Sequence, residues 1–491
     1  MKTLSLDNHK SGLLKILVGF FIVLSAFVFG LLAVSANPMM IGLGVGLVAG
    51  AFLLAVPKIS VHILLSVGLV MGALVSFAGP MFGKLPWALS LLGMLLLLPA
   101  TLSLVKGGGE QRKVPAFIWI AMAFMGYALT VTILGWDSVA ETVAGFKRYF
   151  QVYGLLFALV LLPFGNDDFD RWKKLLLVIA LLQFPFALYE LLILVPQRGG
   201  LSTASYTTDV VAGTFGANME GGSPNVVMVV FLLATFAFVL SRWRSGLLKT
   251  RQGVWLSIFL LLPLGMGESK IAMVMLPMTW FLLIRHDFFR SPIKYLPVLL
   301  SGVVATIVLG YVYVVLIMNS TLQDVVESTI SYNFADAGYA FFYLNRTTVL
   351  SFWWSQQGLH DPVSFFFGHG IGSAFLGQIS GHIGMLYPRY GIDLTAASTL
   401  LWDLGCIGLA MFLAIFISAW RVAGKLYRES SHILIKSDAL ATQASIGLCM
   451  VLIIYSQDIV NLIALEILYA FLLGYLAHLY IDHERERKIS K

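Results

Sequence analysis

The feature that most constrains this 491-residue chain is a series of apolar runs of about 20 residues that recurs along its whole length. A helix of that length spans the ~30 Å hydrocarbon core of a bilayer. The chain is 59% hydrophobic and only 12% charged, whereas soluble domains average about 25% charged residues. A soluble globule could not cover that much apolar surface. We therefore predict an all-α polytopic membrane protein with about 12–14 transmembrane helices.

These runs define fourteen candidate spans. The first is too long for the core of a signal peptide, and no small-residue cleavage pattern follows it, so we expect it to be retained as a span. The spans are predicted to begin near Leu13, Pro38, Ile59, Leu85, Pro115, Tyr149, Lys174, Asn225, Val254, Ile271, Tyr295, Thr399, Ala441 and Leu462.

Basic residues indicate the orientation, because Lys and Arg gather in the cytoplasmic loops of membrane proteins. With the N-terminus inside, 25 of the 32 basic residues fall in cytoplasmic segments. Two of these segments are 242–251 and 421–436. The opposite orientation reverses this ratio. We therefore predict that both termini are cytoplasmic. We interpret the net charge of +7 as a topology signal and not as a surface for nucleic acid.

Two segments on the predicted outer side are long. One covers 196–224 and is rich in Gly, Ser and Thr, and the other covers roughly 319–398 without a spanning run. Loops of this length are usually functional or contain helices of their own. Because aromatic rings favour the headgroup region, we predict short interfacial helices around 340–357. The chain then divides into N-terminal helices (1–145), central helices (146–320), a large outer loop (321–398) and C-terminal helices with a cytoplasmic tail (399–491).

Seven basic residues remain on the predicted outer side, against the charge bias. A guanidinium is always charged and grips an oxyanion in two places, so outward-facing arginines suit an anionic ligand. Plainer alternatives are a snorkelling anchor for Arg148, a lipid-headgroup contact for Arg346 and an ion pair to Asp393 for Arg389. The candidate anion-binding residues, which the resemblance described below implies are diphosphate-binding, are Arg346, Arg148, Arg389, Arg198 and Lys270.

Two histidines of the large outer loop are candidates for a general base. His369 lies among glycines in "GHGIG", where backbone can approach a ligand closely, and His382 lies in "SGHIGML". An imidazole titrates near neutral pH and can accept a proton from a hydroxyl group. The alternative for each is an ordinary loop histidine. No HExxH or CxxC pattern occurs and the outer acids are not paired as DxD, so the sequence predicts no metal site and no cofactor.

Four segments together resemble the O-antigen ligase and polymerase superfamily of bacterial envelope enzymes. They are "GTFGANMEGGSPN" at 213–225, "GESKIAM" from Gly267, "RTTVLSFWW" through "FFFGHGIGSAF" in the large loop, and "TLLWDLGCIGLAMFL" from Thr399. In order, they are similar to the family's outer loop before a span, its short hairpin turn, its Arg, aromatic and Gly-x-Gly pattern, and its closing span. The resemblance covers roughly 147–481.

The resemblance implies a GT-C-like helical fold in the bacterial inner membrane, with a periplasmic active face. It implies polymerisation of undecaprenyl-diphosphate-linked repeat units into O-antigen, capsule or exopolysaccharide by metal-independent, inverting glycosyl transfer. The implied partners are the lipid-linked glycan donor and acceptor, membrane lipid, a flippase and a chain-length regulator. Aromatic residues of the large loop could stack on sugars or anchor at the interface: Tyr332, Tyr339, Trp353 and Trp354.

One departure from the family's pattern concerns the base. Ligase-type members place a His-Asn pair just before the closing span, whereas this stretch reads "GIDLTAAST" and offers Asp393 as its ionisable acid. This favours a polymerase and makes Asp393 the third candidate base. A ligase that moves the glycan to lipid A core or protein is the alternative within the family. A secondary transporter is the alternative of another class, with Glu190, Asp403 and Glu466 as its ionisable residues.

Overall fold

The computed structural model describes residues 50, 52–78, 83–105, 113–197, 210–217, 224–267, 270–311, 314–315, 321–334, 338, 342–377 and 379–489. Its contacts divide the chain into two units, Met1–Ser60 and Val61–Lys491. The second unit contains every helix discussed below, apart from the first residues of α3 (Pro57–Ala78). All regular elements in these residues are helices, which confirms the all-α prediction. The spans predicted from Leu13 and Pro38 lie outside the described residues.

Nine helical segments in the described part of the chain are long and apolar enough to cross a membrane, which confirms a polytopic membrane protein. They are α3, the pair α4 (Leu85–Leu95) and α5 (Leu97–Val105), α6 (Ala116–Leu134), the run of α9 (Asn166–Tyr189), η2 (Glu190–Leu194) and α10 (Val195–Gln197), α11 (Pro224–Arg244), α13 (Ala272–Arg290), α19 (Ala396–Glu429), α20 (Ile433–Tyr455) and α21 (Ile463–Ile489). The spans predicted from Val254 and Tyr295 correspond to α12 (Thr250–Met266) and α14 (Pro292–Tyr311), which are not among the nine.

The segment predicted as a span from Tyr149 is divided in the structure and is not among the nine. That region forms an amphipathic helix, α7 (Val139–Phe150), and a nine-residue helix, α8 (Tyr153–Leu161). At about 1.5 Å per residue, α8 alone is shorter than a bilayer core. It ends at Leu161, and its C-cap residue Leu162 is extended because the next residue is Pro163. The apolar run predicted one continuous helix, but the proline stops α8.

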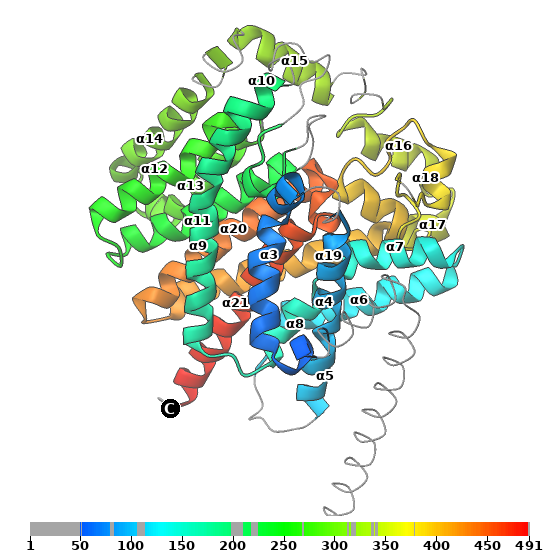
Figure 1. The fold of residues 1–491 in the computed structure, drawn as a ribbon, viewed down its shortest axis with the longest axis horizontal. Coiled ribbons are helices and arrows are strands. Elements are labelled where there is room, and N and C mark those ends of the chain that lie inside the picture. The colour runs from blue at the N-terminus through cyan, green and yellow to red at the C-terminus, as the bar shows by residue number, and fades with distance from the viewer. Residues whose placement is uncertain are drawn as a thin grey trace, which may run out of the picture. The chain divides into compact units, whose positions relative to one another are not determined.

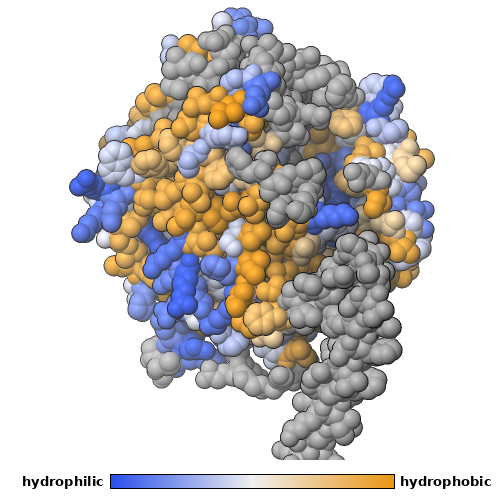
Figure 2. Space-filling model, in the orientation of Figure 1, coloured by the Kyte–Doolittle hydropathy of each residue, from blue (hydrophilic) through white to orange (hydrophobic). Residues whose placement is uncertain are grey.

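The centre of the bundle is formed by α11, α20 and α21. Between 83% and 89% of their apolar windows are buried, against 33% for α9 and α13. In Figure 1, α9 to α14 lie to one side of α20 and α21, and α4 to α8 lie toward the other side. Figure 2 shows apolar side chains over the middle of this face and hydrophilic ones toward its lower edge, as expected for a helical bundle in a bilayer.

The long segment before α19 contains short helices, as predicted for the large loop. They are α15 (Leu322–Phe334), α16 (Thr348–Gln357), α17 (Pro362–Phe367) and α18 (His382–Leu386). In the described residues, the helix predicted around 340–357 begins only at Thr348. Figure 1 places α16 to α18 together beside α19, at the end of the bundle away from the C-terminus. Trp353, Phe365 and Trp402 share one hydrophobic cluster, so this layer packs directly on α19.

Candidate functional site

One face of α7 supplies much of the candidate site. Ser138 caps the helix by accepting a hydrogen bond from the Glu141 amide (3.2 Å), which is the pattern of Ser-x-x-Glu at a helix start. Glu141, Gly145, Arg148 and Tyr149 are all buried. Their spacing of four, three and one residues puts them on one side of the helix. A polar, buried helix face of this kind faces protein and not lipid.

Gly145 lets the glycine-rich loop after α17 approach this face. A Cβ atom on Gly145 would lie 2.4 Å from the carbonyl oxygen of Ile371, so any larger residue would push the loop away. Gly372 in that loop has a φ of +90°, a conformation that other residues rarely adopt. The loop backbone therefore lies directly against α7.

Asp403 in α19 holds the same loop from the other side. Its carboxylate accepts hydrogen bonds from the Gly372 amide (3.0 Å), the Ala374 amide (2.8 Å), the Ser373 hydroxyl (2.8 Å) and the Tyr149 hydroxyl (3.0 Å). Burial and this carboxylate raise the pKa of Tyr149 well above its usual value, so the phenol remains a donor. Asp403 thus joins α7, α19 and the loop.

The kink in α19 explains why the loop can dock there. Gly405 has φ 65° and ψ −170°, which interrupts the helical hydrogen-bond ladder. The carbonyls of Trp402 and Asp403 instead accept from the amides of His369 (3.0 Å) and Gly370 (2.8 Å). The loop thereby satisfies carbonyl groups that a broken helix would leave unpaired.

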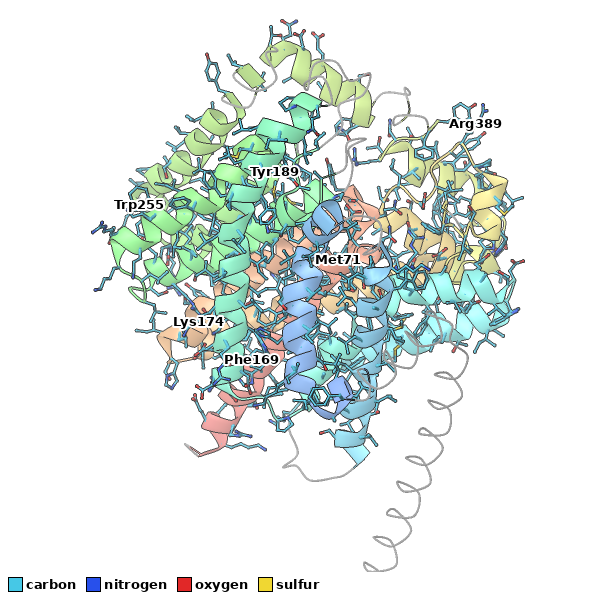
Figure 3. The ribbon with its side chains drawn as sticks, in the orientation of Figure 1. Met71, Phe169, Lys174, Tyr189, Trp255 and Arg389 are labelled. Carbon is cyan, nitrogen blue, oxygen red and sulfur yellow. The ribbon has the colours of Figure 1, made fainter. Side chains whose placement is uncertain are left out.

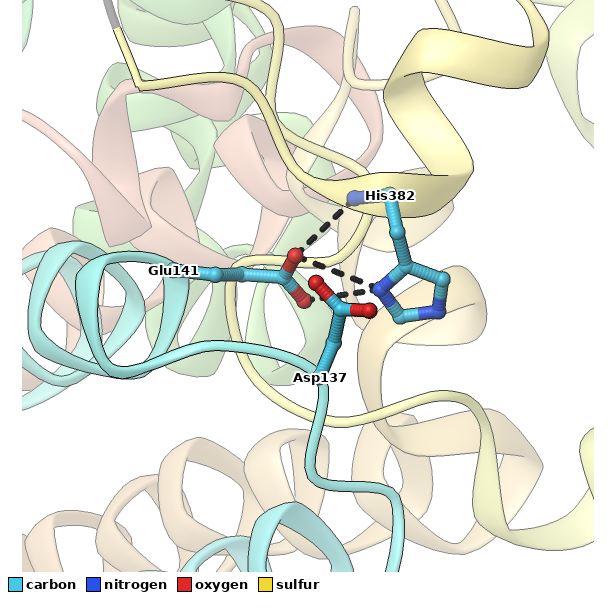
Figure 4. Close-up of side chains that lie close together, drawn as sticks. All are labelled: Asp137, Glu141 and His382. Atoms are coloured by element: carbon cyan, nitrogen blue, oxygen red, sulfur yellow. Dashed lines mark hydrogen bonds and ion pairs between the residues drawn. The ribbon is translucent and has the colours of Figure 1, made fainter.

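Glu141, which is buried, and His382, which is partly buried, form an acid–imidazole pair (Figure 4). Nδ1 of His382 lies 2.9 Å from Oε1 and 3.2 Å from Oε2 of Glu141, and the His382 amide donates to Oε2 at 2.9 Å. The Glu141 side chain is 7% exposed and that of His382 is 32% exposed. A carboxylate on Nδ1 favours the tautomer that leaves Nε2 as a proton acceptor. Nε2 itself makes no hydrogen bond to any residue that the structure describes.

Arg148 is buried, with 3% of its surface exposed, and it makes no ion pair with any described residue. Nε donates to the Asn461 side-chain oxygen (3.2 Å), Nη2 donates to that of Gln457 (2.9 Å), and the guanidinium lies 3.9 Å from the centre of the Phe375 ring. Nη1 is buried and has no hydrogen-bond partner within the described part of the chain. A buried cation held only by neutral groups is costly, and one unused corner of its fork is suited to an anion. This burial excludes the snorkelling alternative.

Arg346 contacts the last residue of α20, next to the turn between α20 and α21 that Arg148 contacts. Its Nε donates to the Tyr455 carbonyl (2.8 Å), its Nη1 donates to Asn333 (3.0 Å), and its guanidinium lies 4.3 Å from the centre of the Tyr455 ring. The turn contains η6 (Gln457–Val460). Arg148 and Arg346, both candidates from the sequence, therefore contact one short segment of the chain.

The other two candidate bases lie beside this group. The His369 ring is 6.1 Å from that of His382 and 6.3 Å from that of Trp402, and its Nε2 is buried with no hydrogen-bond partner among the residues described. Burial and the neighbouring His382 lower the pKa of His369, so it stays neutral. Asp393 is 5% exposed and accepts from the Leu376 amide (3.2 Å). Burial raises the pKa of Asp393, and Arg148 opposes that shift.

One group of side chains could hold a divalent cation. Single ligand atoms of Asp137, Glu141 and His382 all lie within 4.8 Å of one another, with Asp137 exposed. The sequence predicted no metal site because these residues are far apart in the chain, and the fold brings them together. In the structure both Glu141 oxygens are engaged by His382, so an ion would have to replace that hydrogen bond.

The remaining predicted residues lie apart from this group or outside the described residues. Arg389 is exposed beyond α18 (Figure 3), and no ion pair joins it to the buried Asp393. Lys270 lies half-buried at the start of α13. Trp353 is buried against Phe365, whereas Trp354 is 56% exposed and keeps an open face. Arg198, Tyr339 and the side chain of Tyr332 lie outside the described residues.

Sequence reasoning missed Glu141 and missed Asp403 as an anchor of the loop. Glu141 is separated from His382 by 241 residues, and Asp403 from Gly372 by 31. The signal for α7 was present, because Ser138 and Glu141 form a helix-start pattern inside a polar stretch.

No family model matches the sequence, and no curated protein matches it.

Proposed function

We propose that this protein is a membrane glycosyltransferase that polymerises undecaprenyl-diphosphate-linked repeat units at the periplasmic face of the bacterial inner membrane, on a GT-C-like fold whose large outer loop is periplasmic. The observation that carries the proposal is Arg148, a buried guanidinium that forms no ion pair with the described residues and has one N–H corner without a partner among them. The Glu141–His382 pair comes from the same helix and the adjoining loop. Phe375 links the two, because its ring lies on Arg148 and its carbonyl accepts from the Gly381 amide (2.9 Å).

The proposed step has one bond formed and one broken. Nε2 of His382 takes the proton of an acceptor hydroxyl as its oxygen attacks the anomeric carbon of the donor sugar. The bond from that carbon to the diphosphate oxygen breaks, and its electron pair leaves with the diphosphate. Direct displacement inverts the anomeric carbon. Glu141 orients the imidazole and stabilises its positive charge.

The leaving diphosphate needs positive charge beside it. Arg148 and Arg346 provide two guanidinium groups around the turn at η6, and Arg148 makes no ion pair with any residue that the structure describes. Fixed cations in a site with little water stabilise developing negative charge more strongly than they would in bulk water. The proposed transfer is therefore metal-independent.

The proposal is tested with purified enzyme in liposomes that contain lipid-linked repeat units. We expect His382→Ala to lower the initial rate by about 10²–10⁴-fold, and Arg148→Ala by about 10²–10³-fold. The matched controls are His360→Ala and Arg389→Ala, which remove a histidine and an arginine from exposed positions outside the group. Folded His382→Ala and Arg148→Ala enzymes with unchanged rates would refute the proposed site. A product extended by only one transfer onto a different acceptor lipid would reassign the enzyme as a ligase.

A further inference from the structure

A cavity lies toward the end of the bundle that is away from Glu141, Arg148 and His382, at the N-terminal part of α9 and the C-terminal part of α11. It has a volume of about 320 Å³ and lies between α9, α11, α12, α20 and α21. Ligand pockets in proteins begin at about this size. Its depth is apolar, with walls from Phe231, Ala234, Phe238 and Phe471. Its mouth is formed by the charged ends of α9 and α11, where Asp170, Lys173, Lys174 and Arg242 lie.

The charges at the mouth are arranged around one buried acid. Asp438 of α20 is fully buried, and it accepts from Nε (2.7 Å) and Nη2 (2.6 Å) of Arg242. Nζ of Lys173 lies 3.4 Å from Oδ2 of Asp438 and 2.8 Å from Oδ1 of Asp170. These contacts pair two cations with two carboxylates. The group is therefore neutral without Lys174.

Lys174 gives the mouth its net charge. It is exposed, lines the cavity and makes no ion pair with any residue that the structure describes. Figure 3 shows it on the lower half of α9, in the region where hydrophilic side chains gather in Figure 2. The mouth thus carries one positive charge above an apolar cavity, in a helical bundle built to lie in lipid.

We propose that this cavity binds one anionic phospholipid with a single phosphodiester, such as phosphatidylglycerol. One acyl chain occupies the apolar depth between α9 and α11, and the headgroup phosphate lies against Lys174 at the mouth. Basic pockets between transmembrane helices bind anionic headgroups in this way. A single negative charge matches the single unpaired cation, whereas a zwitterionic headgroup leaves the mouth with the charge it already has. The site is independent of the proposed glycosyl transfer.

The test uses the full-length purified protein in detergent and measures the first bound lipid by native mass spectrometry. The probes are phosphatidylglycerol and phosphatidylethanolamine with the same acyl chains, a polyprenyl monophosphate, and glycerol phosphate as a free headgroup. We expect phosphatidylglycerol to bind roughly tenfold more tightly than phosphatidylethanolamine. Free glycerol phosphate should not compete at equal concentration, because it lacks the chain that the cavity holds.

Two variants separate the headgroup from the chain. Lys174→Glu reverses the charge at the mouth, and Ala234→Phe fills the depth from a buried wall position. Each should weaken phosphatidylglycerol binding roughly tenfold. Lys249→Glu makes the same charge change at an exposed position that does not line the cavity, and it should leave binding unchanged. Equal binding of the two lipids would overturn the proposal, as would equal losses in Lys174→Glu and Lys249→Glu. Tighter binding of a polyprenyl monophosphate than of phosphatidylglycerol would also overturn it.

Discussion

Replacing Glu141 with glutamine tests the acid–imidazole pair with the smallest change of shape. Glu141 presents two oxygens to Nδ1 of His382, at 2.9 and 3.2 Å. Glutamine keeps the size of the side chain but replaces one oxygen with an NH₂ donor. An NH₂ facing Nδ1 favours the tautomer with the proton on Nε2, and that nitrogen can then no longer accept a proton. The variant should therefore fold normally and lose most of its activity.

The magnitude follows from the role of the base. Complete loss of general-base help costs about 10²–10⁴-fold in rate, and a carboxylate-to-amide change beside a catalytic histidine costs up to about 10⁴-fold. We expect Glu141→Gln to lower the initial rate of polymer formation by about 10²–10³-fold, because the wrong tautomer is favoured and not enforced. The assay follows chain length from purified lipid-linked repeat units over time.

Asp137→Asn is the matched control for that substitution. Asp137 is exposed and lies in the same group, but it makes no hydrogen bond to His382 in the structure. If the pair acts as a base, Asp137→Asn should change the rate less than about threefold, because Asp137 is exposed and makes no hydrogen bond to Glu141 or His382 in the structure. Equal, large losses in both variants would refute the base and indicate that all three side chains ligate a cation. A fully active Glu141→Gln enzyme would refute the pair outright.

Three further predictions concern the loop, pH and topology. Asp403→Asn leaves two of the buried donors around this side chain without a good acceptor, so the free energy of unfolding should fall by about 2–6 kcal/mol in a thermal unfolding experiment. Cys406→Ser, on the next turn, should lower it far less, and equal stability of the two variants would contradict the anchoring role. Because burial lowers the pKa of His369 below its usual 6.5, the unfolded chain binds more protons there, so the free energy of unfolding should fall as the pH drops below about 6.5. The slope of stability against pH should be smaller in His369→Gln, and an unchanged slope would contradict a buried, neutral His369. Single cysteines at 346, 369 and 389 should react with an impermeant reagent in intact cells, whereas cysteines in 242–251 and 421–436 should react only after permeabilisation; cytoplasmic labelling of position 346 would reverse the predicted orientation.

Long apolar runs were enough to predict the spans of the described chain, because the bilayer requires helices of a fixed minimum length. The same reasoning did not predict how the segment around Tyr149 is divided, because hydropathy alone does not register the polar face of α7 or the stop at Pro163. A helix that is half polar and buried in protein looks, in a running average, like the edge of a span. The capping pattern at Ser138 and Glu141 is the local signal that separates the two cases.

Side-chain chemistry identified some of the site but none of its pairings. Arg148 and His382 were candidates because an outer arginine and a loop histidine are unusual in type and place. Their partners came from the fold, since Glu141 and Asn461 are separated from them by hundreds of residues. Asp403 was considered only as a transporter acid, and its four hydrogen bonds to α7 and the glycine-rich loop depend on the kink at Gly405, which no sequence pattern revealed.

The most direct test of the proposed function is a reaction of the purified wild-type protein with undecaprenyl-diphosphate-linked repeat units in excess EDTA. Two quantities are measured together: the ladder of lipid-linked products and the undecaprenyl diphosphate released. We expect a ladder of lipid-linked glycans of increasing length. One undecaprenyl diphosphate should be released for each new linkage, and the configuration at each joined anomeric carbon should be inverted. Activity that is abolished by EDTA and restored by magnesium would contradict metal-independent transfer through Arg148 and His382. The absence of any ladder, with EDTA and with magnesium, would contradict the proposed polymerase.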